Sequence, residues 1–105
     1  MSGEMKLRAR MIDDDVAEVT VLITHAMETG QRKDPATKNV VPAHFINQLT
    51  ATLNGKATLV AQWGTGIARN PVLDFRIKGA RPGDVVAISA VDNLGTRFEH
   101  KTIVT

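Results

Sequence analysis

The chain has 105 residues, of which 43% are hydrophobic and 23% charged, and its net charge is +2. This length and composition are typical of one globular domain, which we place at residues 1–105. No apolar run is long enough to cross a bilayer. The 13 basic and 11 acidic residues are mixed along the chain and aromatic residues are few, which argues against nucleic-acid binding. Cysteine is absent, which excludes a disulfide, a thiolate metal site and a cysteine nucleophile, so any thiol chemistry must come from a partner.

Alternation of apolar and polar residues begins close to the N-terminus and predicts a β-strand over residues 5–11. Its inward positions are Met5, Leu7, Ala9 and Met11. The three aspartates at 13–15 lack the spacing and the glycine of a calcium loop, so we interpret them as a turn. A second strand has Val19, Val21 and Ile23 on one face, and we expect it to pair with the first strand as a hairpin.

A third and a fourth strand flank the dipeptide Asn54-Gly55. Asn-Gly between two alternating runs predicts a type I′ hairpin turn, because both residues tolerate a positive φ. The inward positions are Phe45, Leu49, Ala51 and Leu53 in the third strand, and Ala57, Leu59, Ala61 and Trp63 in the fourth. We therefore expect the only tryptophan to pack in the core and not to stack on a ligand.

The segment from Gly64 to Pro71 interrupts this alternation. Its glycines would cradle a phosphate at the start of a helix, but no helical periodicity follows, so we favour a plain connection. Three strands complete the chain: one with Leu73, Phe75 and Ile77 inward that ends at Gly79, one with Val86, Ile88 and Ala90 inward, and one over residues 96–104. About seven short strands separated by turns predict an all-β fold, an antiparallel immunoglobulin-like β-sandwich.

The sixth strand is unusual because its outward positions are apolar as well. These positions are Val85, Ala87 and Val91. A strand that is apolar on both faces either lies centrally under other chain segments or presents one face to a partner. We expect contact with a partner here, and self-association when the partner is missing.

The longest connection runs from His25 to Phe45, and a connection of this length is more often functional than idle. An imidazole and thioether set of His25, Met27 and His44 is compatible with copper, so a copper-binding β-sandwich is one hypothesis. In the alternative, Met27 fills an apolar gap and both histidines bond the backbone where strands enter and leave the connection. We favour this alternative, in which Gly30, Pro35 and Pro42 shape a docking element.

Nothing in the sequence indicates catalysis. Ser89 is the only serine beyond position 2, and it lies within a predicted strand without the glycines of a nucleophile elbow. No catalytic residue and no cofactor is therefore predicted.

Several segments together resemble the SoxZ family. The most specific is Thr24 to Asp34, with the sequence THAMETGQRKD, and it is joined by Val41 to Ile46, Gly66 to Pro71 and Val91 to Gly95. The resemblance covers nearly the whole chain. It implies an immunoglobulin-like sandwich that forms a heterodimer with SoxY, the subunit whose C-terminal cysteine carries sulfur intermediates during thiosulfate oxidation. The family itself is not thought to perform the chemistry.

The resemblance also implies a location and a set of contacts. The N-terminus has no apolar export segment, so we expect the chain to reach the periplasm together with a SoxY that carries the signal. We expect SoxY to contact the long connection and the sixth strand, and other Sox enzymes to bind transiently. The predicted partner-binding residues are Met27, Glu28, Thr29, Gly30, Arg32, Lys33, Val85, Ala87 and Val91. Arg32 and Lys33 are expected to guide the anionic, sulfur-loaded tail or a pathway enzyme.

Overall fold

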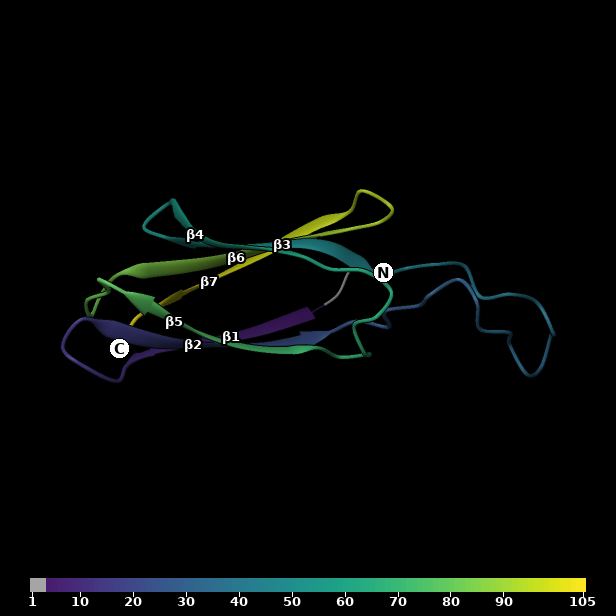
Figure 1. Ribbon diagram of the computed structural model, residues 1–105, viewed down its shortest axis with the longest axis horizontal. Helices are drawn as coiled ribbons and strands as arrows, with labels where there is room; N and C mark the ends of the chain where they lie inside the picture. The colour runs from purple at the N-terminus through teal and green to yellow at the C-terminus, as the bar shows by residue number, and fades with distance from the viewer. Residues whose placement is uncertain (1–3) are drawn as a thin grey trace.

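The computed structural model describes residues 4–105, which form seven β-strands joined by turns and loops (Figure 1). The strands are β1 (Glu4–Met11), β2 (Val16–Thr24), β3 (Ile46–Leu53), β4 (Lys56–Gln62), β5 (Val72–Lys78), β6 (Val85–Asp92) and β7 (Arg97–Ile103). Residues 4–105 contain no helix that is long and apolar enough to cross a membrane.

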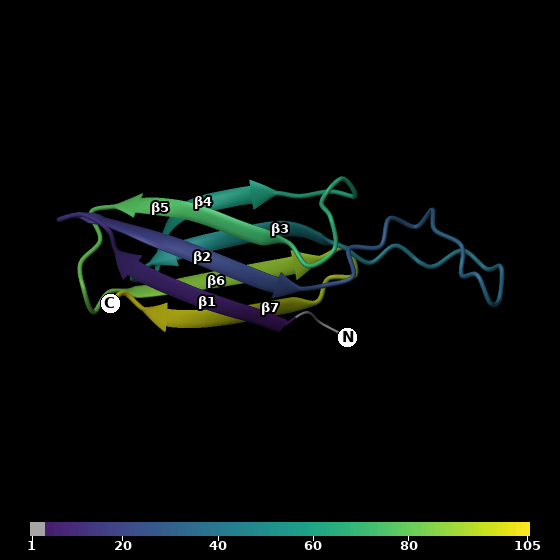
Figure 2. The same cartoon turned by 90° about the horizontal axis from the view of Figure 1, so that it is seen from below.

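The strands form two antiparallel sheets that face each other (Figures 1 and 2). One sheet has the order β1-β2-β5 and the other has the order β4-β3-β6-β7. The β1 and β7 side is closed by the chain end, because the amide of Met11 donates to the carbonyl of Thr105 at 2.8 Å and the amide of Thr105 donates to Ala9 at 3.1 Å. This arrangement confirms the predicted immunoglobulin-like β-sandwich.

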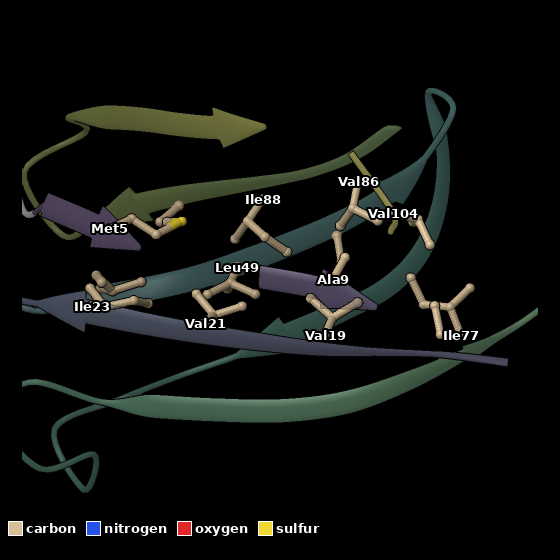
Figure 3. Packing of buried hydrophobic residues seen from close by; sticks show 14 of the residues in the cluster. Met5, Ala9, Val19, Val21, Ile23, Leu49, Ile77, Val86, Ile88 and Val104 are labelled. Carbon is tan, nitrogen blue, oxygen red and sulfur yellow. The ribbon is translucent and has the colours of Figure 1, made fainter. Parts of the chain in front are cut away.

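The core lies between the two sheets and is built from aliphatic side chains of both (Figure 3). Val19 and Val21 of β2 face Leu49 of β3 and Ile88 of β6, and all four are fully buried. Each such side chain stabilises the fold by about 1.5–3 kcal/mol relative to an exposed position. Trp63 is half-buried and packs against this cluster, as expected.

The predicted hairpin at Asn54-Gly55 is confirmed, since φ is 51° at Asn54 and 86° at Gly55, as a type I′ turn requires. The prediction of which residues point inward in the two strands beside this turn is wrong at Ala57. A register shift between Ala51 and Thr52 places a β-bulge in the pairing of β3 with β4, and Ala57 is exposed instead of inward.

A second shift lies at the start of the third strand, where Phe45 packs against the core as expected and Ile46 is buried as well. The register of β3 against β6 changes between Ile46 and Gln48, so Ile46 is fully buried and Phe45 lies half-buried just before the strand. A β-bulge adds one residue and thereby exchanges the two faces of a strand, which simple alternation does not reveal.

The outward face of β6 is covered by neighbours more fully than expected, because β6 is a central strand. Ala87 is 8% exposed yet does not belong to the core cluster; its partners are Thr52 of β3 and Lys101 of β7. Val85 and Val91 are half-buried. The apolar outward face is real, but its residues are shielded in part by the adjacent strands.

The molecule is elongated, with extents of 54 × 21 × 19 Å, because the connection between β2 and β3 projects beyond the sandwich (Figure 1). We call this connection, residues 25–45, the arm. In Figures 1 and 2 it extends to the right of both sheets.

Candidate functional site

The arm is a narrow two-stranded ribbon and not an open loop. Its two sides meet at Glu28 and His44, whose amide groups and carbonyls exchange hydrogen bonds of 2.7 and 3.0 Å, and again at Lys33 and Val40. Between these two bridges, the amide of Val41 donates to the carbonyl of Arg32 at 2.7 Å. Residues 35–40 at the tip are all exposed. An isolated two-stranded ribbon is marginally stable in water, so this shape suits an element that docks on another surface.

Gly30 allows the two sides of the arm to approach each other. Its φ is +84°, a conformation that residues with a Cβ rarely adopt, and a Cβ added there would lie 3.1 Å from the Cβ of Ala43 on the opposite side. The hydroxyl of Thr29 accepts a hydrogen bond from the amide of Gln31 at 3.1 Å and tightens the same bend. Gly30 therefore has the shaping role that the sequence predicted.

The incoming side of the arm is fixed by Asn70 in the connection between β4 and β5. Its side-chain Oδ1 accepts from the amide of His25 at 3.0 Å, and its own amide donates to the carbonyl of His25 at 2.9 Å. Asn70 has a φ of 53°, a left-handed conformation that asparagine tolerates better than most residues. This residue therefore satisfies both backbone groups of the first arm residue.

The outgoing side of the arm is fixed in the same way by Asn93 in the turn between β6 and β7. Its Oδ1 accepts from the amide of Phe45 at 2.9 Å, its amide donates to the carbonyl of Phe45 at 2.9 Å, and its Nδ2 donates to the carbonyl of Ala43 at 3.0 Å. Two asparagines from different loops thus fix the base of the arm, which makes the orientation of the arm a property of the sandwich.

Asp92 completes this base as a buried carboxylate, with 1% exposure. Its Oδ2 lies 3.0 Å from Nε2 of His44, and its Oδ1 accepts from the amides of Leu94 and Thr96 at 3.0 and 2.8 Å. Burial raises the pKa of the Asp92 carboxyl, but the hydrogen bonds from His44, Thr96 and Leu94 outweigh burial, and the pKa is lowered. The carboxylate therefore links the β6–β7 turn to the arm.

His25 lies against His44, with ring centroids 4.6 Å apart. Burial lowers the pKa of His25 below its ordinary value of 6.5, and the nearby His44 lowers the pKa further while Asp92 opposes the shift. Its Nδ1 accepts from the amide of Met27 at 3.0 Å, so the neutral ring carries its proton on Nε2. That nitrogen is buried and has no hydrogen-bond partner among residues 4–105.

These bonds bear directly on the copper hypothesis. The structure does bring His25, Met27 and His44 together, and the potential ligand atoms of His25, His44 and Asp92 lie within 4.8 Å of one another. A histidine that binds a metal donates its other ring N–H, whereas Nδ1 of His25 accepts a hydrogen bond. The sulfur of Met27 accepts from the amide of Ile46 at 3.4 Å, and its side chain belongs to the core. The geometry therefore favours packing for Met27 and backbone bonding for His25. The expected backbone bond is wrong for the ring of His44, which bonds the buried carboxylate of Asp92 instead.

The charged residues of the arm have different environments. Arg32 donates to both carboxylate oxygens of Glu28, from Nε at 3.0 Å and from Nη2 at 2.8 Å. The hydrogen bond from Arg32 lowers the pKa of Glu28, and the charge of Arg69 adds to the effect. Lys33 is exposed and forms no ion pair within the described residues. Of the two cations predicted to guide an anion, only Lys33 is thus fully available.

The predicted partner-binding residues do not form one compact patch. Glu28, Thr29, Gly30, Arg32 and Lys33 line the arm, but Met27 is 4% exposed and Ala87 8%, so these two can only support their neighbours. Val91 lies close to the base of the arm. Val85 lies at the other end of β6, about 20 Å away at the rise of an extended strand.

All four segments of the family resemblance meet at one end of the sandwich. Residues 24–34 and 41–46 form most of the arm, while residues 66–71 and 91–95 contain the asparagines that fix its base. Sequence reasoning missed the role of Asp92, although the alternation contained the signal. Val86, Ile88 and Ala90 are inward positions of β6, and Asp92 is the next position on the same face, so the pattern predicts a buried carboxylate there.

The fold and this end of it define a β-sandwich with a projecting two-stranded arm that is hydrogen-bonded to the sandwich at its base. Comparison with known families identifies it further: the family model described as "Sulphur oxidation protein SoxZ" matches residues 5–103. The chain therefore belongs to the SoxZ family and has a role in sulfur oxidation as part of the Sox system. No curated protein matches the chain.

Proposed function

We propose that this chain is the non-catalytic subunit of a SoxYZ sulfur carrier complex. It pairs with SoxY, whose C-terminal cysteine carries covalently bound sulfur intermediates during thiosulfate oxidation, and it helps to present that complex to the pathway enzymes. The observation that carries the proposal is the SoxZ family match over residues 5–103. The absence of cysteine supports the same division of labour, since this chain has no thiol on which sulfur could be carried.

SoxY binds, in this proposal, along the arm and at the adjacent end of the β6 face. The arm supports this because its exposed ribbon has few internal bonds and gains most from an added surface. Val40 on the arm is 53% exposed, which gives the partner an apolar contact. Glu28, Thr29 and Lys33 supply polar contacts around it, and Val91 extends the surface onto the sandwich.

The site of action we propose is the periplasm, reached together with SoxY. A chain left without SoxY exposes its arm and the β6 face, and we expect it to self-associate through them. Contacts with pathway enzymes are transient, and Lys33 contributes an electrostatic attraction to them that salt weakens.

Co-expression with a tagged SoxY tests the pairing directly. Both chains should co-purify at equal stoichiometry, and mass spectrometry should find sulfur adducts on the SoxY cysteine. Val40→Ser should weaken the complex, while the matched control Ile12→Ser, at an exposed apolar position on the opposite end, should leave it intact. Failure of SoxY to co-purify with the unmodified chain would refute the pairing.

The guiding role of Lys33 has its own test. Lys33→Glu should slow the turnover of thiosulfate by the reconstituted Sox system at low salt, and the difference should shrink as ionic strength rises. Lys56→Glu is the matched control, because Lys56 is also exposed but lies at the far end of β3 and β4. Equal turnover by both variants would contradict the role.

A further inference from the structure

A groove of about 580 Å³ runs between the base of the arm and the connection from β4 to β5. The arm contributes Glu28, Thr29 and Arg32, and the connection contributes Thr65, Gly66 and Arg69. No heavy atom lies within 4 Å of the position that a Cβ on Gly66 would occupy, so this wall of the groove stays open. The groove is therefore a polar recess with one arginine on each side.

The hydrogen-bonding capacity of the two arginines is largely unused. Arg69 is exposed and forms no ion pair with any residue from 4 to 105. Arg32 uses one N–H at Nε and one at Nη2 for Glu28, and a guanidinium has five N–H groups in total. Most of the donors of both side chains therefore remain free for a ligand with several acceptor oxygens.

The groove is held in a fixed shape, which favours binding because little ordering is needed. Asn70 follows Arg69 directly and is bonded to both backbone groups of His25, so the two walls are joined beside the arginine. On the arm side, Arg32 forms a bidentate pair with Glu28, so the carboxylate of Glu28 competes with a ligand for the guanidinium. The two cations thus come from segments far apart in the chain that are tied together at their base.

We propose that this groove binds the oxyanion of an oxidised sulfur group, of the sulfonate class, at the end of a flexible peptide tail. The inference deepens the proposed function and rests on it, since a carrier partner is what would bring such a tail. A guanidinium matches the spacing of oxyanion oxygens and forms charge-assisted hydrogen bonds with them. The hydroxyls of Thr29 and Thr65 add neutral donors. Glu28 opposes the ligand and keeps binding weak enough for release.

The test uses the isolated, isotope-labelled chain and follows its backbone amides by NMR during titration. The probes are N-acetyl-S-sulfocysteine amide, its uncharged counterpart N-acetylserine amide, and inorganic sulfate. The sulfocysteine probe should shift the amides of Thr65, Gly66 and residues 26–29, and the serine probe should not. Binding of inorganic sulfate as tight as that of the sulfocysteine probe would overturn the assignment to a tethered group.

Three variants separate the groove from general attraction to a basic surface. Arg69→Gln should raise the dissociation constant of the sulfocysteine probe about tenfold or more. Glu28→Gln should lower it, because the opposing charge is gone and Arg32 is released. Arg76→Gln, at an exposed position on β5 away from the groove, is the matched control and should change nothing.

Equal dissociation constants for Arg69→Gln and Arg76→Gln would overturn the proposal, as would weaker binding by Glu28→Gln. Circular dichroism of each variant checks that the fold is retained. Co-purification of the Arg69→Gln chain with SoxY is measured in parallel. If SoxY is retained while the probe titration fails, the groove assignment is wrong and the pairing stands. If SoxY fails to bind the unmodified chain, the pairing is wrong whatever the groove binds.

Discussion

Replacing residues 33–40 of the arm with the dipeptide Asn-Gly should weaken the binding of SoxY about tenfold or more while leaving the sandwich intact. The replacement fits the geometry, because the amide of Val41 already donates to the carbonyl of Arg32 at 2.7 Å. That bond becomes the closing bond of a two-residue type I′ turn, for which Asn-Gly is the preferred sequence. The pair of Glu28 with Arg32 and the bridge from Glu28 to His44 are retained.

The expected change in stability is small. None of residues 33–40 belongs to the core, and the bonds lost between Asp34, Lys38 and Asn39 lie entirely within the removed tip. Shortening a connection of roughly twenty residues by six lowers its closure cost by about 0.3 kcal/mol. Changes at surface positions of this kind usually stay within about 0.5 kcal/mol. We therefore expect a free energy of unfolding within about 0.5 kcal/mol of the unmodified chain.

Urea unfolding followed by the fluorescence of Trp63, the only tryptophan, measures this free energy. Binding to immobilised SoxY measures the docking role, and the affinity should fall about tenfold or more, since a few central residues usually supply most of the binding energy. A loss of stability above about 1.5 kcal/mol would mean that the arm supports the fold. Unchanged affinity for SoxY would refute the docking role of the tip.

Three further predictions concern the base of the arm. Gly30→Ala should lower the free energy of unfolding by about 1–2 kcal/mol. It should cost more than the control Gly55→Ala, because an added Cβ meets the Cβ of Ala43 at position 30 and no atom at position 55. Equal losses of unfolding free energy in urea would contradict the contact with Ala43. Asn93→Ala removes the two side-chain hydrogen bonds to Phe45 and Ala43 at the arm base and keeps the backbone bond to Phe45. It should cost about 1–3 kcal/mol, and a loss below about 0.5 kcal/mol would show that the side chain of Asn93 is dispensable. His25 has a lowered pKa, so below about pH 6.5 the unfolded chain binds a proton that the folded chain resists, and stability should fall as the pH drops from 7 to 5. His25→Asn keeps an acceptor for Met27 and should flatten this dependence in urea titrations at each pH, whereas an unchanged slope would assign it to another group.

Local sequence patterns determined the strands and one turn of this protein. The alternation over residues 5–11 predicted β1 correctly, because one face of that strand is buried and the other is exposed to solvent. The dipeptide Asn54-Gly55 predicted its turn correctly, because asparagine and glycine tolerate the positive φ values that the turn requires. The same logic failed at Ile46 and Ala57, where β-bulges exchange the faces. A bulge depends on the partner strand, which the local pattern does not contain.

The sequence by itself also determined the family and directed attention to residues 25–45. It did not reveal that this segment is a ribbon mounted on two asparagines, nor that His44 meets the carboxylate of Asp92 from 48 positions away. It did not reveal that Arg69 faces Arg32 across a groove. These contacts join loops that are distant in the chain, and only the packing of the two sheets brings their ends together. The tertiary structure therefore decided where the arm points and which charges stand beside it.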